Sequence, residues 1–281
     1  MGVSNYRKGS SHMIEIGDDT ILLDHGHGGF GRLLEAGKQP SEVSHLIFTH
    51  LHFDHCADYG TLVLTRWDQA AAGVPELKVF GPPPLARMTR QLFAPDGFFD
   101  VDITARTGMK SSLEAYQARG GFLPRPRPAP LVKEIVAGDV IDGKEWRIST
   151  IEVRHAQPYM ACLAVRFECA DGVFVYSGDT GPIPEMVEFA RDCDLLLHMC
   201  HYLSPAPPSD QQAYAPKSNT GHLELARLAS EANVGMLVTT HSSVRMAEPD
   251  QQQRMLREMA ALYGGRIVFG QDLLRLALPP R

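Results

Sequence analysis

The run Thr49-His-Leu-His-Phe-Asp-His-Cys56 decides how this chain of 281 residues is interpreted. It continues the apolar stretch His45-Leu-Ile-Phe-Thr49, which is typical of a strand covered on both faces. The run contains three imidazoles and one carboxylate within six residues: His50, His52, Asp54 and His55. Imidazole and carboxylate suit zinc and the neighbouring transition metals. Alternation along a loop would let His50 and His52 serve one cation, and Asp54 and His55 a second.

Three further candidate ligands also follow strand-like segments. His155 comes after the segment that ends in Val153, Asp179 follows Tyr176-Ser-Gly178, and His241 follows Val238-Thr-Thr240. Taken singly, such residues are more often interior histidines or turn residues. Loops at the carboxyl ends of strands gather in one crevice of an open α/β sheet. Together with the first cluster, we therefore expect them to complete two coordination spheres.

The pattern of apolar residues predicts a single α/β domain over residues 1–281. Strands are expected near 13–16, 20–24, 45–49, 78–81, 146–153, 162–169, 173–176, 194–197, 234–240, 266–269 and 273–278. Helices are expected near 30–36, 84–93, 183–191, 223–232 and from Pro249-Asp250 to Gly264. Strands and helices alternate irregularly and hairpins are present, which favours a mixed sheet covered by helices.

Residues 94–131 break this pattern. They include Gly120-Gly121 and the run Pro124-Arg-Pro-Arg-Pro-Ala-Pro130. We interpret them as an insertion with a central helix near Ser111–Arg119 and a stiff, extended exit. Long irregular stretches in compact domains are often lids, so the insertion is expected to cover the active site. Its phenylalanines favour an apolar pocket.

Composition limits the classes of function. The formal charge of −6 argues against a surface built mainly to grip nucleic acid. No run of about eighteen apolar residues predicts a membrane span. The five cysteines form no CxxC pair, which is typical of reduced thiols in a cytoplasmic protein.

The chain resembles the metallo-β-lactamase superfamily, and within it the branch of RNase Z, related phosphodiesterases and arylsulfatases. The resemblance rests on Leu22-Leu-Asp24, the His50–His55 motif, His155, Tyr176-Ser-Gly-Asp179, Gly221-His222, Thr240-His241 and Phe269-Gly-Gln-Asp-Leu273. It implies a four-layer αβ/βα sandwich with the metals at one edge. His50, His52 and His155 would hold one metal. Asp54, His55 and His241 would hold the other, and Asp179 would bridge them.

The resemblance implies hydrolysis by two divalent cations, zinc or alternatively manganese or iron. Two adjacent cations can share one water and lower its pKa, which makes a bridging hydroxide the nucleophile. Asp54 is the group expected to orient that hydroxide or take its proton. His222, at a predicted helix start, is the candidate acid for the leaving group.

The pattern departs from RNase Z at two places. Where RNase Z carries His-Glu-Ala-Thr, this chain has His198-Met-Cys-His201, so Met199 replaces the glutamate that partners the leaving-group histidine. Proton delivery could then pass to His198 or His201, and His198, His201 and Tyr202 are candidate substrate contacts. RNase Z also tends to carry a basic arm that grips tRNA between the positions of His155 and Asp179. Only a predicted hairpin occupies that interval here.

The leading hypothesis is therefore a dinuclear hydrolase of a small ester: a phosphodiester, phosphotriester, sulfate ester or lactone. One alternative is an RNase Z-like endonuclease that processes RNA 3′ ends, although nucleic acid is disfavoured as a partner. Another is a mononuclear iron oxidoreductase of the same fold. Base rates for enzymes favour a homodimer.

Overall fold

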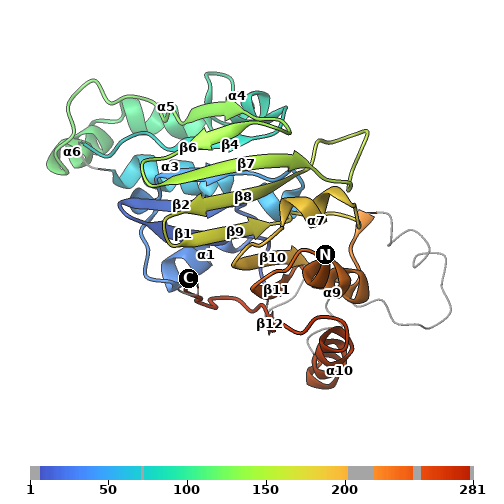
Figure 1. Ribbon diagram of the computed structural model, residues 1–281. Coiled ribbons are helices and arrows are strands. Elements are labelled where there is room, and N and C mark those ends of the chain that lie inside the picture. Colours follow the sequence, from blue (N-terminus) through green and yellow to red (C-terminus); the bar gives the residue numbers. More distant parts are fainter. Residues whose placement is uncertain (1–6, 71–72, 202–217, 243–247, 279–281) are drawn as a thin grey trace. The chain divides into compact units, whose positions relative to one another are not determined.

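The computed structural model describes residues 7–70, 73–201, 218–242 and 248–278 (Figure 1). The chain forms two compact units. We call Gly9–Ile135 the N-terminal unit, and Met1–Lys8 with Val136–Arg281 the C-terminal unit. Each unit contains one β-sheet.

The N-terminal unit is built on a five-stranded sheet in the order β1-β2-β3-β4-β5. β1 (His12–Ile16) and β2 (Asp19–Leu23) form an antiparallel hairpin. The parallel strands β3 (His45–Ile47), β4 (Lys78–Gly81) and β5 (Leu131–Glu134) follow in turn. The sheet is mostly parallel, so the carboxyl ends of β2, β3 and β4 lie along one edge. This arrangement brings Asp24 next to the loop that begins at Phe48.

Short helices connect these strands. They are α1 (Gly29–Glu35), the 3₁₀ helix η1 (Pro40–Glu42), α2 (Phe53–Cys56), α3 (Tyr59–Gln69) and α4 (Leu85–Phe93). Their apolar faces enclose one core with the sheet, in which Leu46, Leu62 and Leu85 have no exposed surface. The aromatic rings of Phe48, Tyr59 and Phe93 meet edge to face within this core.

The insertion (residues 94–131) belongs to the N-terminal unit. It contains α5 (Asp100–Gly108) and α6 (Lys110–Ala118), followed by an extended segment that leads into β5. The helix expected near Ser111–Arg119 is confirmed as α6, and α5 is additional. Arg125 is 6% exposed and anchors the extended segment. Its guanidinium lies over the ring of Trp67 and contacts Asp68 at 2.9 Å.

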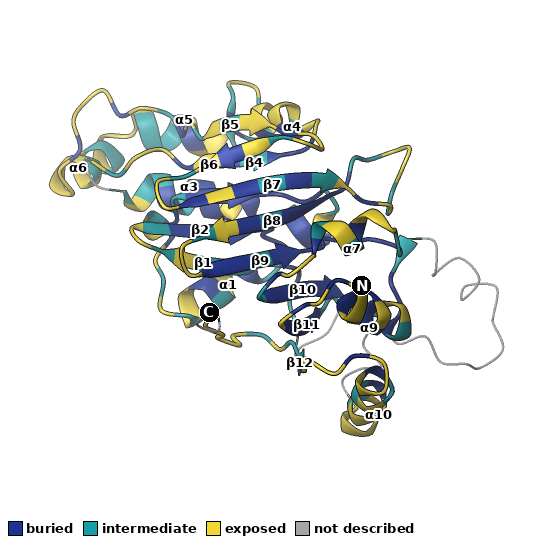
Figure 2. Ribbon diagram, in the orientation of Figure 1, coloured by how far each residue is buried: buried dark blue, intermediate teal, exposed yellow. Residues whose placement is uncertain are grey.

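The C-terminal unit is built on a seven-stranded sheet in the order β12-β11-β10-β9-β8-β7-β6. An antiparallel meander comprises β6 (Val140–Asp142), β7 (Trp146–Glu152), β8 (Leu163–Cys169) and β9 (Gly172–Tyr176). β10 (Leu195–Met199), β11 (Met236–Thr240) and β12 (Arg266–Phe269) continue it in parallel. Figure 2 shows that β9 and β10 are buried along almost their whole length, as apolar central strands must be.

Three helices connect the strands in the described part of this unit: α7 (Glu185–Phe189), α9 (His222–Glu231) and α10 (Pro249–Ala260). α9 is buried through Leu225, Ala226 and Ala229, and α10 through Met255 and Met259. Both apolar faces join one core cluster. Because the two helices pack against the same core, polar side chains at the border of their apolar faces lie close to one another.

Most predicted elements are confirmed, and one is wrong. The hairpin of β1 and β2 and the hairpin of β8 and β9 occur where the sequence predicts them. The closing strand expected at Leu273–Leu278 is absent: the described residues there form a turn, in which Leu274 N bonds to Gln271 O, and then a segment with no strand partner. Its apolar residues are partly exposed, so apolar composition alone was misleading. Among the described residues, no helix is long and apolar enough to cross a membrane.

Candidate metal centre

The N-terminal unit presents four of the predicted ligands from the loop after β3. His50, Asp54 and His55 are buried, and His52 is the residue that precedes α2. Main-chain hydrogen bonds fix the loop against residues 9–26: Ser10 N bonds to Asp54 O, and His25 N to His55 O. The contact is so close that a Cβ on Gly26 would collide with the carbonyl of Asp54. Backbone packing therefore sets the positions of these ligands before any ion binds.

Asp24, at the carboxyl end of β2, orients two of these histidines. Its carboxylate has no exposed surface and accepts Nδ1–H of His55 at 2.8 Å. It also accepts the hydroxyl of Thr49 at 2.9 Å. Because that hydroxyl gives its proton to Asp24, it accepts Nδ1–H of His50 at 3.1 Å. Both imidazoles thus carry their proton on Nδ1, which would make Nε2 the coordinating nitrogen if a metal binds here.

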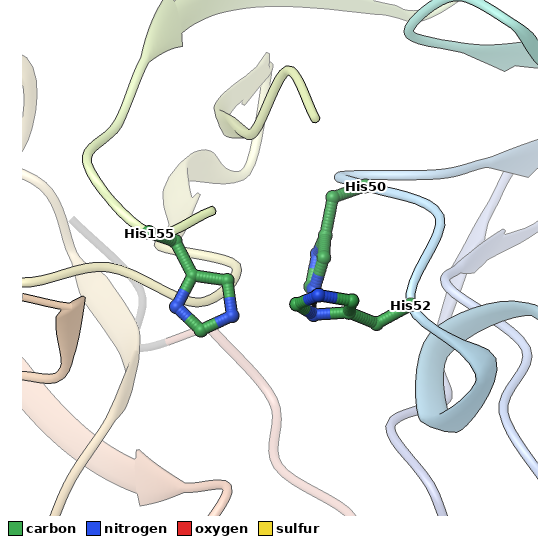
Figure 3. A group of neighbouring side chains, drawn as sticks. All are labelled: His50, His52 and His155. Atoms are coloured by element: carbon green, nitrogen blue, oxygen red, sulfur yellow. Dashed lines mark hydrogen bonds between the residues drawn. The ribbon is translucent and has the colours of Figure 1, made fainter. Parts of the chain in front are cut away.

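The coordinating atoms of the N-terminal unit lie close to one another. His50 Nε2 is 3.0 Å from Nδ1 of His52, and the two rings meet edge to face (Figure 3). The ligand atoms of His50 and His55 lie within 4.8 Å of each other, as do those of Asp54 and His55. With the proton of His50 on Nδ1, its Nε2 lone pair is directed at His52. Such pairs of nitrogens are suited to one cation.

The C-terminal unit presents the other three predicted ligands from separate strand ends. His155 follows β7, Asp179 follows β9 and His241 follows β11. Asp179 Oδ2 lies 3.1 Å from His241 Nε2 and 3.6 Å from His155 Nε2. Nδ1 of His155, whose ring Figure 3 also draws, donates to the main-chain carbonyl of Ser218 at 2.8 Å. β7, β9 and β11 run in the same direction, so their carboxyl ends lie at one edge of the sheet and these three residues come together there.

Two residues in the loops that carry the candidate ligands and Asp24 have an unusual backbone conformation. His241 has φ of 49° and Asp24 has φ of 57°, both in the left-handed region that non-glycine residues rarely adopt. Such conformations persist where the surrounding structure enforces them, and they are frequent at functional sites. Both residues directly follow a strand, so the unusual turn redirects each side chain at the edge of its sheet.

The remaining predicted site residues have different environments. His198, on β10, has no exposed surface, donates Nδ1–H to the carbonyl of Met199 at 2.7 Å, and has its pKa lowered to about 4 by burial. The ring of His201 stacks near that of His241, with centroids 6.2 Å apart. His222 begins α9 and is 1% exposed. Tyr202 lies outside the described residues. The roles of all four in contacting substrate or donating a proton stay predictions.

The donor set fits divalent cations of borderline softness. Its members are imidazole nitrogens and carboxylate oxygens, which zinc, manganese and iron accept. His50 and His55 are oriented through Asp24, and His155 through Ser218, by the hydrogen bonds at Nδ1 that metal-binding histidines typically make. Sequence reasoning named these residues as candidate ligands but assigned no role to Ser218, which is distant in sequence from His155 and contacts it through the main chain.

Comparisons with known proteins agree with this chemistry. A family model described as Metallo-beta-lactamase superfamily matches residues 5–241. Ribonuclease Z of Mycobacterium sp. (strain KMS) is 30% identical over 276 residues, with 98% of this chain and 91% of that protein covered. Ribonuclease Z of Mycobacterium bovis (strain BCG / Pasteur 1173P2) is 28% identical over 279 residues, with 98% and 94% covered.

Solved structures show the same fold. The metallo-β-lactamase fold protein YhfI from Bacillus subtilis has a TM-score of 0.70 and 17% identity, and the match covers 96% of this chain and 92% of that one. The short form of human tRNase Z has a TM-score of 0.67 and 15% identity, with 98% and 95% covered. The fold class predicted from the sequence is confirmed.

Proposed function

Because the chain belongs to the metallo-β-lactamase superfamily and is a metal-dependent hydrolase of ester bonds, we propose that it uses two zinc ions to hydrolyse a small phosphodiester or related ester. The observation that carries this proposal is that each unit by itself gathers a set of imidazole and carboxylate side chains suited to divalent cations. His50, His52 and His155 would hold one cation. Asp54, His55 and His241 would hold the second, and Asp179 would contact both.

When bound, the two cations would supply Lewis acidity and lower the pKa of a shared water. The protein supplies the orientation. Asp24 fixes the tautomers of His50 and His55. Asp54 is 7% exposed, so its carboxylate has little competing solvent and can accept the proton of an attacking water. His222 is proposed to protonate the leaving oxygen.

The surroundings of the site support a small substrate. The interval from His155 to Asp179 contains only a loop and the β8–β9 hairpin, without a separate arm that could grip RNA. The cationic side chains of the insertion form ion pairs within the N-terminal unit: Arg106, Lys110, Arg119, Arg125 and Arg127. Paired charges contribute less to binding a polyanion.

An aromatic pair beside the ligand loop also supports this substrate class. Phe53, between two proposed ligands in the sequence, is 68% exposed. Its ring stacks with that of His27, with centroids 6.0 Å apart. An exposed aromatic face can pack against an apolar or aromatic group of a small ester.

A second candidate function is endonucleolytic processing of RNA 3′ ends. The observation that favours it is the 30% identity to a protein named Ribonuclease Z, over 98% of this chain. Identity of that extent reopens nucleic acid as a partner, which the acidic composition had disfavoured. The two candidate functions share the same metal chemistry. They differ in the part of the substrate that the protein binds beyond the scissile bond.

One set of assays separates them. Metal analysis of purified protein should find two ions per chain. Turnover should then be measured on aryl and alkyl phosphodiesters, a phosphotriester, a sulfate ester, a lactone and a precursor tRNA with a 3′ trailer. Preference for a small ester supports the first proposal, whereas efficient cleavage of the precursor alone supports the second. One iron per chain with no hydrolysis would contradict both.

Variants test the assigned ligands. His52→Ala and Asp179→Ala should each abolish hydrolysis and leave a folded protein. His45→Gln is the matched control, because His45 is a buried histidine at the other end of β3 that contacts Ser44 at 2.8 Å. Retained turnover in either ligand variant with both metals bound would contradict the assignment.

A further inference from the structure

The residue that should support proton delivery is changed in this chain. By the resemblance to RNase Z described above, Met199 stands where a glutamate is expected. Its side chain has no exposed surface, and its sulfur accepts the main-chain N–H of Thr180 at 3.0 Å. A thioether cannot hold an imidazole through charge. If His222 delivers a proton, its carboxylate partner must come from elsewhere.

The backbone around His222 is firmly fixed next to the loop of Asp179. His222 N donates to His201 O at 2.9 Å, which ties the start of α9 to the extension of β10. The hydroxyl of Thr220 donates to the carbonyl of Thr180, the residue after Asp179, at 2.8 Å. The position of His222 is therefore set by main-chain contacts, while the orientation and charge of its ring depend on a side-chain partner.

That partner is a carboxylate on the neighbouring helix. Nε2 of His222 lies 2.8 Å from Oε2 of Glu258 on α10. The other carboxylate oxygen of Glu258 accepts Nε–H of Arg254, one helical turn earlier, at 2.9 Å. These hydrogen bonds, that of Arg254 first and that of His222 second, lower the pKa of Glu258. Glu258 is therefore ionised at neutral pH, and its carboxylate accepts a hydrogen bond from Nε2–H of His222.

We propose that Glu258 is the positioning residue that replaces the missing glutamate, so that His222 presents Nδ1 as its proton-transfer nitrogen. This inference rests on the proposed function. A carboxylate at Nε2 fixes the tautomer of the neutral ring and stabilises the imidazolium form. In the reaction, the bond from phosphorus, sulfur or acyl carbon to the leaving oxygen breaks. Nδ1–H of the imidazolium passes its proton to that oxygen, and the neutral ring regains a proton from water.

The other charged groups near His222 do not offer the same support. Arg254 contacts Glu258, and Glu224 lies two residues along α9 with an exposed side chain. His201 contributes a main-chain carbonyl, and burial lowers the pKa of its own ring to about 4. His198 is fully buried, with its Nδ1–H already given to a carbonyl. Both histidines are neutral at pH 7 and are poor proton donors.

The first test measures the tautomer of the His222 ring in the metal-free protein and requires no enzymatic activity. Nitrogen-15 NMR, with His222→Ala to assign the signal, should show the Nε2–H tautomer. Glu258→Gln preserves the shape but replaces the anion with an amide that can either accept or donate at Nε2, so the Nε2–H tautomer of His222 should no longer dominate. Glu231→Gln, at the exposed end of α9, is the matched control and should change nothing. An unchanged tautomer population in Glu258→Gln would overturn the proposal.

The second test compares leaving groups in the metal-loaded enzyme at equal metal content. In Glu258→Gln, kcat for an ester with an alkoxide leaving group should fall about tenfold, with KM unchanged. The 4-nitrophenolate ester should lose less than about twofold, because that leaving group needs no proton. Equal losses for both esters would refute the role of Glu258 and leave the proposed function intact. A wild-type enzyme inactive on every ester would instead refute the proposed function, and the NMR result would still decide the role of Glu258.

Discussion

Asp24→Asn tests whether an anion behind the ligands controls metal binding. Asp24 lies in the left-handed backbone region, which asparagine tolerates well, so the substitution adds little strain. The wild-type carboxylate accepts three kinds of proton: the N–H and the hydroxyl of Thr49, and Nδ1–H of His55. An amide of the same shape has only one oxygen. One of these donors must therefore face the NH₂ group.

The expected loss of metal affinity follows from the donor that is left facing the NH₂ group. If the amide oxygen stays with Thr49, the NH₂ group faces Nδ1 of His55. The ring must then accept a proton there and turn a protonated Nε2 towards the metal. If the oxygen faces His55 instead, the hydroxyl of Thr49 loses its acceptor, and the orientation of His50 loosens. Loss of such a hydrogen bond behind a ligand typically weakens metal binding about 10- to 100-fold, or about 1.4–2.8 kcal/mol.

Competition with a chromophoric chelator measures that affinity directly. Asp19→Asn is the matched control, because Asp19 lies at the other end of β2 and also contacts a buried histidine, His45, at 3.3 Å. The control should bind metal as wild type does. Thermal melting of the metal-free proteins shows whether each variant is folded. Unchanged affinity in Asp24→Asn would refute the claim that Asp24 fixes the coordinating nitrogens.

Three other variants test the N-terminal unit. Asp68→Asn should cost about 1 kcal/mol of stability at neutral pH. Burial acts to raise the pKa of Asp68, but Arg125 and Arg106 lower it overall, so its contribution disappears as pH falls through the folded-state value. Melting curves of variant and wild type should therefore converge in acid, and a constant difference would contradict this. Phe53→Ala should raise KM several-fold for aryl esters but not for alkyl esters; equal changes would mean that Phe53 does not meet the substrate. Gly26→Ala should displace the ligand loop and reduce the bound metal, and full metal content would contradict the close packing against Asp54.

Local patterns predicted the ligands because their chemistry is concentrated at strand ends. His50, His52, Asp54 and His55 lie together in the sequence, and a buried strand precedes them. The same reasoning found His155, Asp179 and His241 after β7, β9 and β11. In parallel strands, the order of residues along the chain already determines which side chains meet at an edge. The fold could therefore be inferred without knowledge of packing, and so could the gathering of the candidate ligands at the ends of strands.

Features that depend on packing between distant segments were missed. α3 was not predicted, although Leu62 and Val63 pack in the core, because its apolar residues resemble those of a strand. The burial of an arginine of the insertion was not predicted either. In the structure, Arg125 is buried against Trp67 and Asp68, residues more than fifty positions away. No local pattern indicates such a partner.

The partner of His222 illustrates the same limit at the site itself. The resemblance to RNase Z placed Met199 where a glutamate is expected, which left proton delivery open between His222, His198 and His201. The structure offers another solution, because α9 and α10 share an apolar face through Leu225 and Met255. That packing brings Glu258 to His222 across 36 positions of sequence. A site can keep its chemistry when one strand loses a charged residue, provided that a helix packed beside it carries the same charge to the same nitrogen. The loss of a motif residue is therefore weak evidence for the loss of its function until the neighbouring elements have been searched for a replacement.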